Sequence, residues 1–129
     1  MKVRLSNERI VNNAAKLKEI AQKQLPIKVS YAIAKNISKI ESELKIYNKE
    51  REKLIDKYAV KDTEGKILSY ENGNVKFKED CIELWNKDIN ELLAIENEIE
   101  IHQFNFSLLD GYNNLSPAEL IAIDYMIEE

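Results

Sequence analysis

The stretch IAKNISKIESELKIYNKEREKLIDKY, residues 33–58, decides the fold of this chain. Within it, one series of positions alternates steps of four and three residues, and only Arg51 in that series is not apolar. A 3.5-residue period keeps one seam of a helix against a partner helix. At 1.5 Å per residue, such a helix is about 38 Å long. The series consists of Ile33, Ile37, Ile40, Leu44, Tyr47, Arg51, Leu54 and Tyr58.

Two further helices are predicted on either side of this long helix. Before it, Ser6 or Asn7 can cap a helix over about residues 7–24. Pro26 interrupts that helix, so the long helix is expected over about 26–58. After it, a helical period returns over about 78–98 and should run back along the long helix as an antiparallel hairpin. Its seam consists of Ile82, Trp85, Ile89, Leu92, Glu96 and Ile99.

Short β segments are predicted between and after these helices. The dipeptide Asn72-Gly73 between two alternating runs predicts a β-hairpin over about 66–77, with a two-residue turn that needs positive φ at both positions. Residues 99–106 alternate as a strand does, and the N-terminal residues 2–5 are a candidate partner for that strand.

A capping box marks the last helix. Ser116 and Glu119 stand three residues apart with Pro117 at the first helical position, which predicts a helix over about 117–127.

With 129 residues the chain has the length of one ordinary domain. We therefore expect a single domain, 1–129, of the α+β class and mostly helical. It should contain a long antiparallel helical hairpin, a small β-hairpin or sheet and a short C-terminal helix.

Composition limits the class of protein. The chain is 44% hydrophobic and 33% charged, which argues against both disorder and a membrane protein. Its N-terminal residues carry no secretory signal pattern, so we expect a cytoplasmic protein. A single cysteine, Cys81, rules out an internal disulfide and a multi-cysteine zinc site.

The charges are unevenly distributed along the sequence. Residues 1–40 carry nine Lys or Arg against two Glu, whereas residues 61–129 carry five Lys against sixteen Asp or Glu. Either the acidic C-terminal part folds onto the basic N-terminal part, which we favour, or the two parts face different partners. The candidate interaction surface comprises Arg9, Lys16, Lys23, Lys28, Lys35 and Lys39. In the second case these residues could form a nucleic-acid or nucleotide-binding module, which is our alternative function.

No residue pattern points to catalysis. His102 is the one histidine, so a histidine-paired metal site within the chain is excluded. The three glycines, at 65, 73 and 111, cannot form a phosphate-binding glycine motif. Most carboxylates alternate with lysines at helical spacing, as on a solvated helix face. We therefore predict no catalytic, cofactor or metal residues and a non-enzymatic protein.

Arg51 is the charged residue within the apolar series. Burying a charge is costly unless it is paired. Asp88, next to Ile89 in the facing seam, is the candidate partner in a buried ion pair. In the other interpretation the aliphatic part of Arg51 packs while its guanidinium reaches water.

The order of these elements resembles a family of small proteins encoded by tailed phages and prophages of Gram-positive bacteria. The segments that carry the resemblance are LPIKVSYAIAKN (25–36), KIE (39–41), REKLIDKY (51–58), the acidic glycine-containing hairpin, ELL (91–93) and LSPAEL (115–120). That family is catalogued as a domain of unknown function, so the resemblance implies no catalytic or binding residue. It implies an accessory, assembly or host-defence-inhibiting protein that binds a host or phage protein in the bacterial cytoplasm.

Self-association is a further expectation. The long helix offers about 26 residues of seam and the facing helix about 18, so part of the seam could be left for a second copy.

Overall fold

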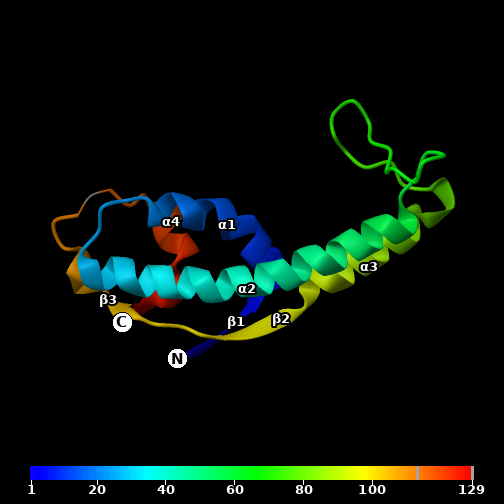
Figure 1. Ribbon diagram of the computed structural model, residues 1–129. Helices are drawn as coiled ribbons and strands as arrows, with labels where there is room; N and C mark the ends of the chain where they lie inside the picture. The colour runs from blue at the N-terminus through cyan, green and yellow to red at the C-terminus, as the bar shows by residue number, and fades with distance from the viewer. Residues whose placement is uncertain (113, 129) are drawn as a thin grey trace. The chain divides into compact units, whose positions relative to one another are not determined.

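The computed structural model describes residues 1–112 and 114–128. It divides into two compact units. The first unit contains Met1–Leu44 and Glu96–Glu129, and the second contains Lys45–Ile95. Helix α2 (Ile27–Tyr58) contributes residues to both units (Figure 1). The single-domain expectation stays a prediction.

The mostly helical α+β class is confirmed, and the first two helices begin where the sequence signals place them. The Ser6 side chain caps α1 (Asn7–Ala21) by accepting a hydrogen bond from the backbone N–H of Arg9 at 3.1 Å. This helix ends three residues earlier than predicted, and α2 then begins at Ile27, directly after Pro26. The proline therefore fixes the start of α2 rather than the end of α1.

The N-terminal strand pairs as the sequence suggested, but its partner begins earlier than predicted. Strand β1 (Lys2–Ser6) runs antiparallel to β2 (Glu96–Glu100), with Lys2 opposite Glu100. The helix predicted to reach residue 98 therefore ends at Ala94. Pairing with β1 buries Ile99, and the side chain of Asn97 donates to the carbonyl of Leu5 at 3.1 Å. These tertiary contacts outweigh the helical period of the local sequence.

The rest of the predicted strand is interrupted. Residues 101–103 leave the sheet, and β3 (Phe104–Asn105) then pairs in parallel with β4 (Ile127–Glu128). Between them lies a short 3₁₀ helix, η2 (Phe106–Leu109). The apolar residues of this segment stand at odd positions up to Ile101 and at even positions from Phe104 onward. This shift occurs where the chain changes from one sheet to the other.

The capping box of the C-terminal helix is confirmed. In α4 (Pro117–Ala122), the Ser116 hydroxyl accepts from the N–H of Glu119, and the Glu119 carboxylate accepts from the N–H of Ser116. The helix is shorter than the predicted 117–127, because a 3₁₀ turn, η3 (Asp124–Met126), and β4 follow it. Burial of Met126 and pairing of β4 with β3 take the place of further helical turns.

The core of the first unit brings α1, the N-terminal part of α2, both small sheets and the C-terminal segment together. Its largest fully buried apolar side chains are Ile20, Val29, Ile33, Ile123 and Met126. One polar side chain shares this core. Asn36 is 0% exposed; its amide donates to the carbonyl of His102, and its side-chain oxygen accepts from the N–H of His102, both at 2.8 Å.

The second unit contains the predicted antiparallel helical hairpin. A short 3₁₀ helix, η1 (Glu79–Cys81), leads into α3 (Ile82–Ala94), which runs back along the C-terminal part of α2 (Figure 1). The Tyr58 hydroxyl donates to the Asp88 carboxylate at 2.6 Å across the two helices. Along α2, Tyr47 and Tyr58 are buried as the apolar series predicts.

The β-hairpin forms with a different turn from the predicted one. Tyr70 N–H donates to the carbonyl of Asn74 at 2.7 Å, so three residues, 71–73, connect the two arms instead of two. Gly73 has a φ of 86°, but Asn72 does not have a positive φ. Its side chain instead accepts from the N–H of Asn74 at 3.0 Å. The predicted two-residue turn is therefore wrong, and one positive-φ glycine closes a three-residue loop.

Candidate functional site

The basic residues of the candidate interaction surface are partly engaged by the C-terminal segment of the same unit. The Arg9 guanidinium lies 2.8 Å from the Asp124 carboxylate and 4.9 Å from the centre of the Tyr125 ring. The Lys23 ammonium lies 2.9 Å from the buried Glu119 carboxylate and also donates to the carbonyl of Asn114. Acidic residues near the C-terminus thus neutralise two of the N-terminal cations.

Of the other four basic residues, three have weaker or different partners. Lys39 donates to the carbonyl of Glu100 at 2.8 Å, and Lys16 lies 3.9 Å from the Glu19 carboxylate one turn along α1. The Lys35 ammonium lies 5.0 Å from the centre of the Tyr31 ring, and Lys28 is exposed. The six cations therefore do not form one uniformly available surface, which supports the favoured interpretation of the charge asymmetry.

Glu119 combines the capping box with the ion pair. The hydrogen bond from the Ser116 N–H, followed by that from Lys23, holds the pKa of the Glu119 carboxyl below its usual value despite burial. A carboxyl with a lowered pKa stabilises the folded state above its unfolded pKa, and this stabilisation disappears as the pH falls through the folded pKa.

Replacing Lys23 by methionine should therefore destabilise the protein in a pH-dependent manner. Near pH 7, the buried Glu119 carboxylate would lose its cation, at a cost of about 1–2 kcal/mol. Near pH 3 this cost should shrink because Glu119 takes up a proton. Urea unfolding at both pH values measures the difference, with Lys28→Met as the control. An equal loss at the two pH values would contradict the role of the ion pair.

The predicted buried ion pair between Arg51 and Asp88 is wrong. Arg51 is exposed, and the Asp88 carboxylate instead accepts the hydrogen bond from Tyr58. This bond, together with burial, raises the pKa of Tyr58. Because the long Arg51 side chain reaches water, its charge needs no buried partner.

The remaining chemically active side chains are dispersed. His102 is exposed and belongs to the first unit, whereas Cys81 is half-buried and belongs to the second. Within residues 1–112 and 114–128, no group of three or more His, Cys, Asp and Glu side chains is placed to hold a metal ion. No helix in these residues has the length and hydropathy that a bilayer span requires.

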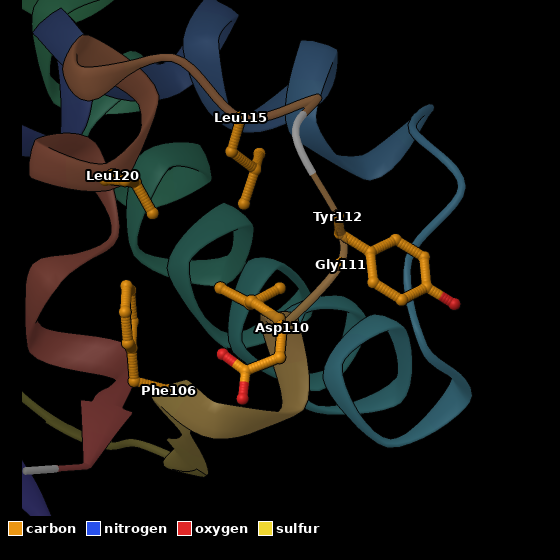
Figure 2. A pocket seen from close by; sticks show the side chains of 7 residues that line it. Phe106, Asp110, Gly111, Tyr112, Leu115 and Leu120 are labelled. Atoms are coloured by element: carbon orange, nitrogen blue, oxygen red, sulfur yellow. The ribbon is translucent and has the colours of Figure 1, made fainter.

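The first unit has an apolar pocket of about 240 Å³ next to η2 and α4. Figure 2 shows Phe106, Leu115 and Leu120 pointing into one space, while the ring of Tyr112 points away from it. Leu115 and Leu120 flank the capping box at the positions of a hydrophobic staple. The walls of this pocket therefore also hold the chain at the start of α4.

The second unit has a groove between α2 and α3, which we call the acidic groove. Leu54, Leu92 and Ile95 form its apolar part, and the carboxylates are Glu50, Asp88 and Glu91. Its volume is about 440 Å³, and no basic residue in the described part of the chain lines it. Ile95 is 51% exposed. The groove thus combines apolar surface open to solvent with a rim of negative charge.

A second cavity of this unit, which we call the arginine pocket, lies between the two helices and the hairpin. It has a volume of about 530 Å³. Its lining residues are Arg51, Ile55, Tyr70, Asn72, Gly73, Asn74, Val75, Phe77 and Trp85. The rings of Phe77 and Trp85 are stacked, with centroids 4.3 Å apart and planes at 23°. Of the described residues in this lining, Arg51 alone is charged.

Sequence reasoning identified neither of these two cavities. The acidic groove could have been found from spacing, because Glu50 and Leu54 are four residues apart on α2, and Asp88 and Leu92 are four residues apart on α3. Ile95 follows directly after the end of α3. The arginine pocket could not, because it depends on the path of the hairpin.

Compared with protein-family models, curated proteins and solved structures, the chain matches none of them. The phage resemblance stays a prediction.

Proposed function

We propose that this chain is a non-enzymatic interaction protein that binds a host or viral protein through the acidic groove. The supporting observation is the groove itself. In it, half-buried Leu54 and Leu92 and exposed Ile95 lie among three carboxylates, and no basic residue of the described chain lines it. The resemblance to small phage proteins suggests an accessory, assembly or defence-inhibiting role in the bacterial cytoplasm.

The chemistry of the groove indicates the kind of partner. A groove between two helices suits an amphipathic helix that inserts apolar side chains at helical spacing. Of the three carboxylates, Glu50 lies 3.0 Å from Lys53, Asp88 accepts from Tyr58, and Glu91 has no ion-pair partner within the described residues. Such a rim favours lysine and arginine on the flanks of the partner helix and disfavours acidic partners.

Affinity capture from infected bacterial cells, followed by mass spectrometry, tests this function. The wild type should recover a defined host or viral protein. An Ile95→Ser variant should recover at least about tenfold less of that protein, because the groove loses apolar contact area. The control is Ile121→Ser, which removes an isoleucine that is 67% exposed outside the groove. Equal recovery by wild type and Ile95→Ser would reject the groove as the binding site.

The alternative function uses the basic residues of the N-terminal third to bind nucleic acid or nucleotides. It is weakened by the contacts of Arg9 with Asp124 and of Lys23 with Glu119, because these cations already have anionic partners. Lys28 and Lys35 remain exposed and could still contribute.

A further inference from the structure

The arginine pocket has the charge of an anion-binding site. Arg51 is exposed, and within the described residues its guanidinium makes no ion pair or hydrogen bond. Among the residues that the structure describes, no carboxylate lines the pocket. A second cation is close, because the Lys76 ammonium lies 5.2 Å from the centre of the Tyr70 ring, which is part of the lining. A guanidinium presents paired N–H donors that suit phosphate and carboxylate oxygens.

The pocket also has an aromatic wall, which consists of the rings of Tyr70, Phe77 and Trp85. The Phe77–Trp85 stack joins the hairpin to α3, so two of its three rings hold each other in position. The third ring, Tyr70, is 56% exposed. Aromatic side chains of this kind bind planar rings by stacking, with little dependence on which base is stacked.

The tip of the hairpin supplies hydrogen-bonding groups at the same pocket. Asn72 and Asn74 line it with Gly73 between them, and a Cβ placed on Gly73 would meet no atom within 4 Å. There is therefore room for a ligand against the backbone here. The Asn72 side chain is held by its bond to the Asn74 N–H. Amide groups can pair with the edges of a base or with ribose hydroxyls.

We propose that the arginine pocket binds a nucleoside phosphate, with the base against the aromatic wall and the phosphate on Arg51. A planar ring, hydrogen-bonding edges and an anion are the three features that this lining recognises together. The volume of about 530 Å³ lies within the usual range for small-ligand sites. No basic residue of the first forty lines the pocket, so this site is separate from the candidate interaction surface.

The same chemistry is present in a free mononucleotide and in the phosphorylated end of a single strand. The chain contains one tryptophan, Trp85, and it lines the pocket, so its fluorescence reports on this site directly. The full chain is titrated with the four ribonucleoside monophosphates and with short single-stranded oligonucleotides that carry or lack a 5′-phosphate. Adenosine and inorganic phosphate are titrated separately.

We expect a saturable change in Trp85 fluorescence with at least one nucleoside phosphate below about 1 mM, and weaker binding of adenosine and of phosphate alone. Arg51→Gln should weaken binding by about tenfold to a hundredfold. Tyr70→Ala should weaken it by about tenfold. Lys49→Gln, which removes an exposed cation of α2 outside the pocket, should leave it unchanged.

Saturation by mononucleotides assigns the free ligand, and saturation only by 5′-phosphorylated oligonucleotides assigns the strand end. Either outcome supports the proposal. Absence of saturation with every probe would overturn it, as would binding that Arg51→Gln leaves intact while circular dichroism shows a folded variant.

Discussion

An Asn36→Leu variant is expected to lose about 2–5 kcal/mol of unfolding free energy. Asn36 is fully buried, and its side chain satisfies both the N–H and the carbonyl of His102. Leucine would keep the volume but leave these two backbone groups without their partner. Each unsatisfied buried group costs about 1–3 kcal/mol.

Urea unfolding followed by far-UV circular dichroism measures this loss. The control is Asn12→Leu, which changes an exposed asparagine on α1 and should alter stability by no more than about 0.5 kcal/mol. A comparable small change for Asn36→Leu would show that the bonds to His102 do not hold the segment between β2 and β3 against α2.

Replacing Ile33 by alanine should also cost about 2–5 kcal/mol. Ile33 opens the apolar series on α2 and is 1% exposed within the core of the first unit. Its truncation removes apolar contacts and leaves a cavity that the packed neighbours cannot fill completely.

A second isoleucine on the same helix provides the comparison. Ile27 is 80% exposed, so Ile27→Ala should change the free energy of unfolding by about 0.5 kcal/mol or less. Similar losses for both variants would mean that the 3.5-residue series does not mark the buried face of α2.

The helical part of the fold could be predicted because its signals are local. Pro26 places the start of α2, Ser116 and Glu119 place the start of α4, and the apolar series identifies the buried positions Ile33, Ile40 and Tyr47. Each of these depends on spacing within one segment, which the sequence contains in full.

The errors occur where long-range contacts decide between local alternatives. Residues 96–100 fit both a helical seam and a strand, and pairing with β1 selects the strand. At the hairpin, the Asn72 side chain bonds to the backbone of Asn74 and shifts the register by one residue. Because the arginine pocket depends on that hairpin, its composition could not be read from the order of residues alone.

Arg51 illustrates the same limit. The series correctly places it on the face of α2 that turns toward other parts of the second unit, since it lines a cavity with Trp85 and the hairpin. Whether its charge is paired depends on the reach of the side chain, which spacing does not determine.

The central claim is that the acidic groove selects a basic amphipathic helix. Isothermal titration with a synthetic helical peptide, carrying leucines at i, i+4 and i+7 and lysines on its flanks, tests it most directly. The double variant Glu50→Lys with Glu91→Lys should bind this peptide at least about tenfold more weakly than the wild type. The matched control, Glu52→Lys with Glu83→Lys, makes the same charge change on α2 and α3 outside the groove and should retain clearly tighter binding. Equal weakening by the two double variants would contradict the claim, because it would show that only net charge matters.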